Sequence, residues 1–523
     1  MARIALGRVL VVGAALNLAA AAILGGYDFR IGPLHLFAHQ ALKPQQILVA
    51  ALLLALALRP RLAQRPALPA DGAWPVFLLA IPAVLFLPSI GINFEYRDWN
   101  HAHITSAIRG LRPLAALFTG PQADGFYRPL GFVSLWIDNL IFGPHAWGYH
   151  LQSVALHLLN VTLAWRLFRR LNFGARTASW AAATMAVAAV ALEPVIWPAA
   201  RFDLLAAAFT MAALACAIDY LRGGRGLACA AAFTFLGILS KETAYSVPVV
   251  VLFLIATAPV WDLQRPVFAR TARLLAAVSV PCAMGLLIRL AVYAGLGGYP
   301  GQSLAPTLRG AVMLVVRLFP APLLALNSNV RLGLVGGAAA VLFAACCVLI
   351  ALGSGALDRK TYAIAGLALA SALPVLNVAG WMGPSMLHSR YFYWPAVWVA
   401  LLMVRLIETC RVPRVALAAL LIANALAMTS NLLVYRDVLR SAERVAARVG
   451  RDVRERPEVR AIQLAGLPET DNGVVFFADE AAGRAREESQ GRPVDLVPAA
   501  AADPPPSERT RIYRWDPLLG DVR

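Results

Sequence analysis

The sequence Ser240-Lys241-Glu242-Thr243 decides how the rest of this chain is interpreted. It lies between two apolar runs, residues 233–239 (Phe-Thr-Phe-Leu-Gly-Ile-Leu) and residues 247–255 (Val-Pro-Val-Val-Val-Leu-Phe-Leu-Ile), which otherwise have the composition of membrane-spanning segments. A charged side chain at membrane depth is costly and normally faces a protein interior. The two charges therefore predict a polar site inside a bundle of membrane helices.

The composition of the chain is that of an integral membrane protein. Of its 523 residues, 59% are hydrophobic and 15% are charged, with a mean hydropathy of +0.65, whereas an ordinary soluble domain has roughly 25% charged residues. Apolar runs of about 18 to 22 residues recur along most of the chain, and each is long enough to cross about 30 Å of hydrocarbon.

The positive charge of the chain follows the pattern of membrane topology. Residues 436–523 contain 15 Arg against 16 Asp or Glu, so the net charge of +18 resides entirely in the part before them. Arg and Lys gathered in short loops mark the cytoplasmic side of a membrane protein. We therefore expect no nucleic-acid partner. The six cysteines lie in or at the ends of apolar runs without Cys-x-x-Cys spacing, which predicts neither a disulfide nor a metal cluster.

The alternation of apolar runs and Arg-rich loops predicts an all-α polytopic protein with about 13 membrane helices. Its amino terminus would be cytoplasmic. The expected spans are residues 8–25, 46–58, 74–93, 147–167, 178–192, 203–221, 227–240, 245–261, 274–294, 332–353, 361–378, 392–408 and 414–434. Residues 130–142 contain Asp138 and are too short for a crossing, so we expect an interfacial helix there.

Three regions follow from this pattern. Residues 1–73 would be extra amino-terminal helices, and residues 74–434 a core with a large outer loop at 94–146. Residues 435–523 are charged and would form a small soluble α/β appendage on the outer side, with an amphipathic helix at 436–449 and short strands at 461–464, 474–477 and 511–515.

Ionic residues gather on the predicted outer side: Asp98, Arg128, Glu193, Arg201, Lys241 and Arg390. Further polar candidates in the same stretches are Tyr127, His150, Asp203 and Glu242. Several have an ordinary structural explanation. Arg97 and Asp98 could end a helix at the interface, Arg201 could pair with Asp203 at a helix start, and Lys241 could pair with Glu242. His150 and His157 share one helix face, where they could be bundle contacts. Several cations on one side would instead suit a lipid-linked phosphate.

The order of these short motifs resembles that of the GT-C membrane glycosyltransferases, in particular the bacterial relatives of protein O-mannosyltransferases (glycosyltransferase family 39-like). The resembling stretches are residues 94–99, Tyr127-Arg128-Pro129-Leu130, residues 148–160, residues 194–205, Ser240-Lys241-Glu242 and Arg390-Tyr391-Phe392-Tyr393-Trp394-Pro395. The resemblance covers about residues 74–434. It implies a membrane enzyme that takes a sugar from a polyprenyl-phosphate donor on the outer face.

The resemblance also implies roles for single residues. Asp98 occupies the place of the family's acidic base, and Lys241, Arg201, Arg390 and Arg128 would bind the donor phosphate. Glu242, Asp203, Glu193, His150 and Tyr127 would support them. The chain departs from the family in three places: Arg97 stands where a second acid is common, Glu193 where His is common, and Ser389 where an acid is common.

The expected reaction is inverting transfer of the sugar to an acceptor hydroxyl. Asp98 would accept the hydroxyl proton while the polyprenyl phosphate leaves, and the cations would stabilise the growing phosphate charge. A divalent cation stays possible, although no metal ligands are assigned. Two other classes stay open: a transporter or flippase of a lipid-linked substrate, and a catalytically inactive GT-C-like scaffold. We expect the protein in the cytoplasmic (inner) membrane.

Overall fold

The structure is a computed structural model of the chain. It describes residues 11–12, 14–15, 27–31, 34–38, 42–58, 73–94, 104–122, 125–263, 267–293, 295, 308–319, 357–376, 378, 388–409, 414–456, 458–459, 461–465, 470–471, 474–475, 495–497, 510–516 and 521–522. The predicted spans at 8–25 and 332–353 fall almost wholly or wholly outside these residues.

Most of the described residues are helical. The α-helices are α2 (Leu42–Leu58), α3 (Ala73–Phe86), α5 (Leu111–Thr119), α6 (Pro129–Phe142), α7 (Ala146–Arg170), α8 (Ala175–Ala186), α9 (Leu192–Ile196), α10 (Phe202–Gly223), α11 (Leu227–Ser240), α12 (Val247–Ala256), α13 (Phe268–Tyr293), α14 (Leu308–Leu318), α16 (Arg359–Ala372), α17 (Tyr393–Thr409) and α18 (Arg414–Glu455). Short 3₁₀ helices are η2 (Leu87–Gly91), η3 (Ala189–Ala191), η4 (Pro198–Ala200), η5 (Glu242–Ser246), η6 (Ala258–Trp261), η7 (Leu373–Val375) and η9 (Ser389–Phe392).

The strands form small sheets near the two ends of the chain. They are β1 (Tyr27–Ile31), β2 (Leu34–Ala38), β3 (Ala461–Ala465), β4 (Thr470–Asp471), β5 (Val474–Val475), β6 (Asp495–Val497), β7 (Thr510–Asp516) and β8 (Asp521–Val522). β1 and β2 pair antiparallel, and β6-β3-β7-β8 is a four-stranded sheet in which β3 runs parallel to β6 and β7. β3, β5 and β7 lie where the sequence predicts strands, whereas the β1–β2 hairpin was not predicted.

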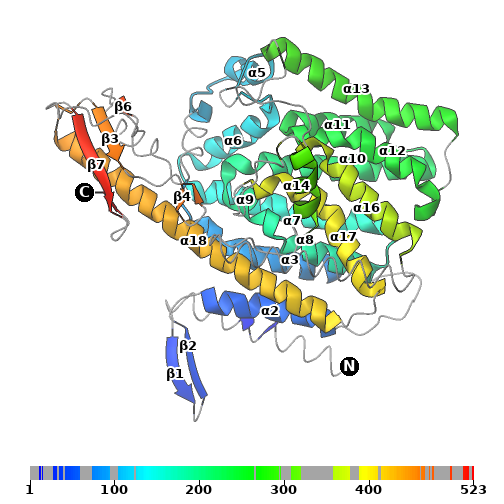
Figure 1. Cartoon of the computed structure of the whole chain (residues 1–523), viewed down its shortest axis with the longest axis horizontal. Coiled ribbons are helices and arrows are strands. Elements are labelled where there is room, and N and C mark those ends of the chain that lie inside the picture. Colours follow the sequence, from blue (N-terminus) through cyan, green and yellow to red (C-terminus); the bar gives the residue numbers. More distant parts are fainter. Residues whose placement is uncertain are drawn as a thin grey trace.

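The core of the bundle is built on α7, α8, α10 and α17 (Figure 1). α7 and α10 run in the same direction, since contacts between them ascend together along both helices: Tyr149 with Arg201, Asn160 with Leu204, and Arg170 with Asp219. The chain can return to the start of α10 because α8 and α9 lie between the two helices in sequence.

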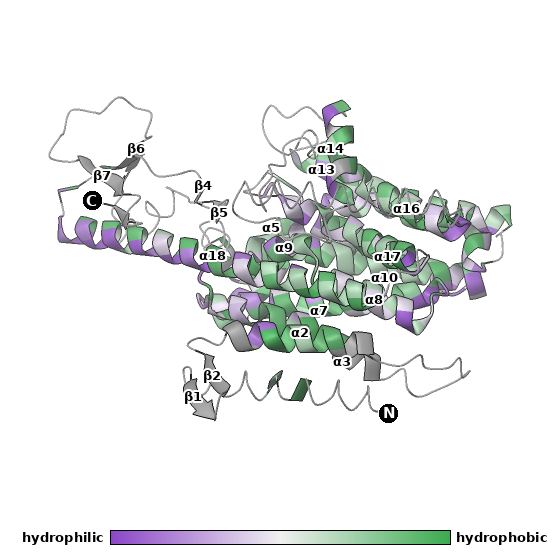
Figure 2. Cartoon of the chain, turned by 60° about the horizontal axis from the view of Figure 1, so that its bottom comes forward, coloured by the Kyte–Doolittle hydropathy of each residue, from purple (hydrophilic) through white to green (hydrophobic). Residues whose placement is uncertain are grey.

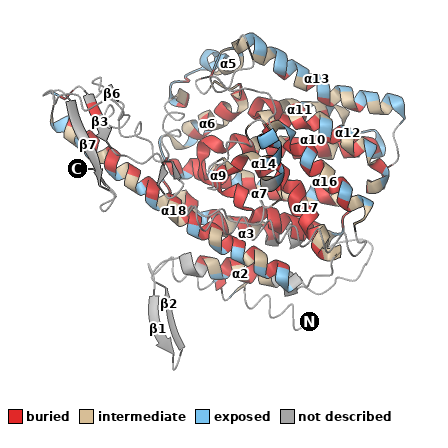
Figure 3. Cartoon of the chain, in the orientation of Figure 1, coloured by how far each residue is buried: buried red, intermediate tan, exposed pale blue. Residues whose placement is uncertain are grey.

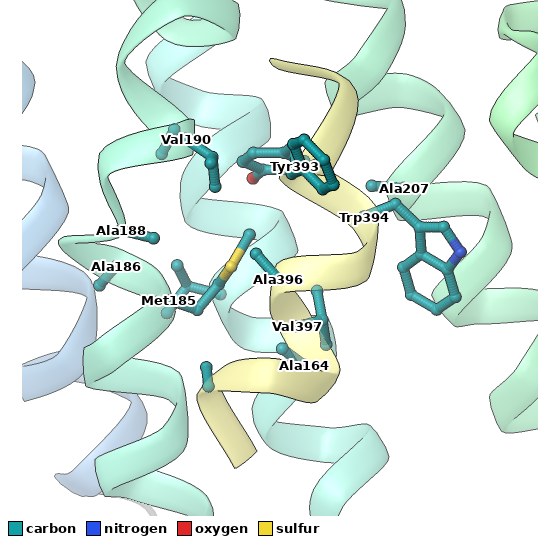
Figure 4. Packing of buried hydrophobic residues seen from close by; sticks show 14 of the residues in the cluster. Ala164, Met185, Ala186, Ala188, Val190, Ala207, Tyr393, Trp394, Ala396 and Val397 are labelled. Carbon is teal, nitrogen blue, oxygen red and sulfur yellow. The ribbon is translucent and has the colours of Figure 1, made fainter. Parts of the chain in front are cut away.

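Small side chains let the central helices approach closely. Figure 4 shows Met185 pointing toward Ala396 of α17, and Met185, Ala186, Val190, Ala396 and Val397 are all buried. The centre of the bundle is almost entirely buried, whereas α13 exposes side chains along its length (Figure 3). Most of the exposed residues in its second half are apolar, as lipid contact requires, among them Val280, Met284, Leu287 and Leu290.

Four helical segments among the described residues are long and apolar enough to cross a membrane. They are Pro198–Gly223, Phe268–Tyr293, Ser389–Thr409 and Val415–Glu455, and the bent pair Ala175–Ala186 and Ala189–Ile196 could form a fifth span. The chain is therefore a multi-pass helical membrane protein. The predicted count of thirteen is not confirmed, partly because several apolar helices, such as Leu227–Ser240 and Gln45–Leu54, are short.

The transition from bundle to appendage differs from the prediction. The sequence indicated a span ending at residue 434 followed by a separate amphipathic helix, but α18 continues without interruption for 42 residues. Its first half is apolar and packs along α2, and its far half is markedly more polar (Figure 2). No proline occurs between residues 414 and 455, so nothing in the backbone forces a break.

Two local features fix helix ends near the predicted cytoplasmic loops. Gly226, between α10 and α11, has φ +103°, and a Cβ there would lie 2.8 Å from the carbonyl oxygen of Cys216. Asp358 caps α16 by accepting a hydrogen bond from the Thr361 amide at 2.9 Å. Burial alone would raise the pKa of Asp358, but the hydrogen bonds from Thr361 and the ion pair with Arg405 hold it below its ordinary value.

Candidate active site

Lys241 and Glu242 project from a sharp break between helices. α11 ends at Ser240, Lys241 is extended with φ −166° and ψ 155°, and η5 begins at Glu242. Neighbouring side chains on extended backbone point in opposite directions. The two residues therefore do not pair with each other, and each binds a partner from a distant part of the sequence.

Lys241 forms a buried ion pair with Asp203. Lys241 Nζ lies 2.5 Å from Asp203 Oδ2, and the side chains are 5% and 3% exposed. Asp203 is in the first turn of α10, where the helix dipole favours a carboxylate. Arg390 Nε approaches the same oxygen at 4.0 Å, so one carboxylate links the Lys241 turn to the chain just before α17.

Glu193 holds Arg390 and its neighbours from the other side. Its carboxylate accepts hydrogen bonds from the backbone amides of His388 (3.2 Å) and Arg390 (3.0 Å), and from Ser389 Oγ (3.3 Å). It also forms an ion pair with Arg390 Nη1. Glu193 and Ser389 are two of the positions at which the chain departs from the family pattern, and here they are in direct contact.

Glu242 binds two arginines from other helices. Its carboxylate lies 2.8 Å from Arg128 Nη2 and 3.2 Å from Arg289 Nη1. Arg128 precedes α6, and Arg289 belongs to α13. This group is more open than the Lys241–Asp203 pair, because Glu242 is 25% exposed and Arg128 15%.

Aromatic rings cover the central cations. The Tyr391 ring centroid lies 4.8 Å from Lys241 Nζ and 4.7 Å from Arg390 Cζ. Trp197 covers Arg390 at 4.7 Å. Such contacts stabilise a cation that is partly removed from water.

Arg201 belongs to a separate network. It forms an ion pair with Asp138 of α6, and it donates hydrogen bonds to the Gln152 side chain and to the backbone oxygen of Tyr149 at 2.6 Å. The side chains of Arg201 and Asp138 are 0% exposed. The expectation that Arg201 pairs with Asp203 is wrong, because Asp138 takes the guanidinium and Lys241 takes Asp203. The network joins α6, α7 and α10.

The remaining predicted residues lie around these groups or outside the described part. His150 is buried in α7, one residue from the Arg201 contact at Tyr149, and His157 contacts Tyr393 Oη at 2.7 Å. Tyr127 donates a hydrogen bond to the Phe118 carbonyl at 2.8 Å, and burial, followed by the neighbouring Tyr293, raises its pKa. Asp98 lies outside the described residues, as do Arg97 and Trp99.

The described residues form two ionic groups that adjoin at the Lys241–Glu242 peptide, and we call these seven side chains the ionic cluster. Lys241, Asp203, Arg390 and Glu193 make one group, and Glu242, Arg128 and Arg289 make the other. Arg128 lies near enough to act electrostatically on both Asp203 and Lys241. Four are cations and three are carboxylates, so the cluster has one positive charge in excess. Arg289 was not predicted, although an Arg inside the expected span 274–294 is itself a signal of a polar site within the bundle. Within the described ranges, no three His, Cys, Asp or Glu side chains are grouped as metal ligands would be.

Comparison with known proteins relates this region to one enzyme family. Residues 128–284 match the family model described as dolichyl-phosphate-mannose-protein mannosyltransferase. The expected resemblance to GT-C glycosyltransferases is confirmed over this segment, which includes Arg128, Glu193, Asp203, Lys241 and Glu242. No curated protein matches the chain.

Two solved structures are similar in outline, both of ArnT from Cupriavidus metallidurans. One is bound to undecaprenyl phosphate and one is in the apo state. Each is 14% identical to this chain, with 82% of this chain and 90% of the other covered, and the TM-scores are 0.44 and 0.45.

Proposed function

We propose that this chain is a membrane glycosyltransferase that transfers a sugar from a polyprenyl-phosphate donor to an acceptor hydroxyl. One observation carries the proposal: Arg128, Lys241 and Arg390, which are far apart in sequence, meet in the ionic cluster. Two of them lie in the segment that matches dolichyl-phosphate-mannose-dependent enzymes, and dolichyl phosphate is a polyprenyl phosphate.

The cluster has the charges that a leaving phosphate needs. Transfer breaks the bond between the anomeric carbon and the phosphate oxygen, so negative charge grows on the phosphate in the transition state. Lys241 and Arg390 are held in place by Asp203 and Glu193 before the donor arrives, and cations that need no reorganisation stabilise such charge best. The more open Arg128 would meet the phosphate first.

Asp98 remains our candidate for the base. It would accept the proton of the acceptor hydroxyl as that oxygen forms a bond to the anomeric carbon, while the polyprenyl phosphate departs with the bonding electrons. Arg201 is assigned a positioning role in this proposal, because its buried pair with Asp138 supports the start of α10, where Asp203 lies.

The contact between Glu193 and Ser389 supports an active rather than an inactive protein. The family pattern has His and an acid at these two places, and this chain has an acid and Ser. In this chain Glu193 is the carboxylate of the contact: it accepts a hydrogen bond from Ser389 Oγ and forms an ion pair with Arg390. A negative charge therefore lies beside the arginine.

The test measures release of polyprenyl phosphate from radiolabelled polyprenyl-phosphate mannose and glucose in membranes that contain the protein. We expect Asp98→Asn to lower the rate by about 10² to 10⁴-fold, the usual contribution of a general base. Glu95→Gln, which alters a carboxylate three residues away, is the matched control.

Three results would count against the proposal. Equal rates for wild type and Asp98→Asn, at equal expression, would remove Asp98 as the base. Equal losses for both variants would show that the loop is needed only structurally. Movement of the intact donor between leaflets without release of polyprenyl phosphate would indicate a transporter.

A further inference from the structure

A polar cavity lies where α18 leaves the bundle. It has a volume of about 350 Å³ and is lined by residues 90–93, by residues 144–147 at the start of α7, and by residues of α18 between 436 and 443. Its polar lining side chains include Asn93, His145, Arg436, Arg440 and Glu443. None of them belongs to the ionic cluster.

The charges of the cavity favour an anion. Arg436 and Arg440 are four residues apart on α18, so they lie on one face of the helix. Arg436 pairs with its neighbour Asp437 at 3.2 Å, whereas Arg440 has no hydrogen-bond or ion-pair partner within the described part of the chain. Among the described residues of the lining Glu443 is the one carboxylate, and it accepts a hydrogen bond from Asn93 Nδ2 at 2.7 Å.

The other lining groups suit a small hydroxylated molecule. Glu443 and Asn93 offer an acceptor and a donor for hydroxyl groups. Trp147 lines the cavity and is 47% exposed, so its ring can cover the carbon skeleton of a ligand. The volume lies in the lower part of the range for small-molecule sites.

We infer that this cavity binds a phosphate ester with free hydroxyl groups, with Arg440 and Arg436 on the phosphate and Glu443 on a hydroxyl. Arginine suits this ligand because its planar fork can donate two hydrogen bonds to one phosphate. The cavity lies beside the start of α7, and α7 and α10 run in parallel, so it is at the same end of the bundle as Asp203. The inference does not depend on the proposed transferase activity.

Two sources could supply this chemistry: a soluble glycerol or sugar phosphate, and the headgroup of an anionic lipid. Binding is measured by calorimetry on the full-length protein in nanodiscs. Glycerol 3-phosphate in phosphatidylcholine discs tests the soluble source, and glycerol is its neutral control. Nanodiscs with phosphatidylglycerol test the lipid source, which would reduce the binding of added glycerol 3-phosphate by competition.

The decisive variant is Arg440→Gln, an exposed position at which folding should be preserved. We expect it to weaken glycerol 3-phosphate binding about tenfold, equivalent to ~1.4 kcal/mol. Arg444→Gln, one turn further along α18 and outside the lining, should stay within twofold of wild type. Trp147→Leu should also weaken binding, which gives a second variant that alters no charge.

The possible outcomes separate clearly. Loss of binding in Arg440→Gln but not in Arg444→Gln supports the site, and competition by phosphatidylglycerol assigns it to a lipid headgroup. Equal binding by wild type and Arg440→Gln overturns the inference, as does equal affinity for glycerol and glycerol 3-phosphate. Because no transfer reaction is measured, failure of this test leaves the Asp98 experiment unaffected.

Discussion

Replacing Lys241 by methionine tests the phosphate-binding role of the ionic cluster. Lys241 Nζ has three donors, and one is directed at Asp203 Oδ2, so two remain for ligand oxygens. A hydrogen bond to a charged group contributes about 1.5 to 3 kcal/mol. We therefore expect Lys241→Met to weaken donor binding by roughly 10- to 150-fold, measured by titration of a polyprenyl-phosphate sugar into protein in nanodiscs.

The same substitution should also destabilise the fold, and this second effect must be separated from the first. Without Lys241, the one cation that the described residues leave paired with the buried Asp203 carboxylate is Arg390, at 4.0 Å. Stranding one partner of a buried pair costs about 3–5 kcal/mol, which thermal unfolding would detect. The double variant Lys241→Met/Asp203→Asn removes one charge of each sign, so its net charge equals that of the wild type.

The double variant separates the effect of Lys241 on stability from its effect on donor binding. We expect it to recover most of the thermal stability and none of the donor affinity. If it binds the donor as tightly as the wild type, Lys241 does not contact the phosphate. If Lys241→Met unfolds at the wild-type temperature, the ion pair with Asp203 is not the buried contact described above.

Three further substitutions test the architecture by thermal unfolding in detergent. Arg201→Ala should cost about 3–5 kcal/mol by stranding Asp138, and restored stability in Arg201→Leu/Asp138→Leu would confirm the cause, whereas an unchanged single variant would contradict it. Gly226→Ala should cost about 1–3 kcal/mol because alanine is strained at positive φ, with Gly223→Ala as the unstrained control; equal effects would refute this explanation. Asp358→Asn should cost about 0.5 kcal/mol at pH 7 by weakening the pair with Arg405. The folded pKa of Asp358 is lowered, so this difference should persist above the ordinary aspartate pKa of about 4 and vanish as the pH falls below it; a difference that grows in acid would be incompatible with a lowered pKa.

Hydropathy located most of the helices but could not count the spans. Runs such as residues 227–240 are apolar throughout, and the structure has a helix there of only 14 residues. The composition of such a run does not reveal whether it crosses the bilayer or ends at a break inside the bundle. The turn at Lys241 is an example. The helix ends there inside the bundle because Lys241 and Glu242 form ion pairs with residues that are distant in sequence.

The sequence predicted that the charged residues of the site form ion pairs, but it did not predict which residues pair with each other. The motifs placed Arg201 beside Asp203 and Lys241 beside Glu242, and local pairing was the simpler interpretation. The structure pairs Lys241 with Asp203, 38 residues away, and Arg128 with Glu242, 114 residues away. Lys241 is extended, so its side chain diverges from that of Glu242. Arg201 and Asp203 are two residues apart at a helix start, where side chains at that spacing do not face each other. Both carboxylates therefore bind cations from other helices.

Because α18 is uninterrupted, its length determines the rotation of the carboxy-terminal strands about the helix axis. At 1.5 Å and 100° per residue, its 42 residues form a shaft about 63 Å long. One residue inserted after Tyr435 would rotate the carboxy-terminal strands by about 100° around that shaft while advancing them only about 1.5 Å. Arg440 would turn with the strands and Asn93 would not. The number of residues in α18 therefore determines whether Arg440 faces Asn93 across the cavity.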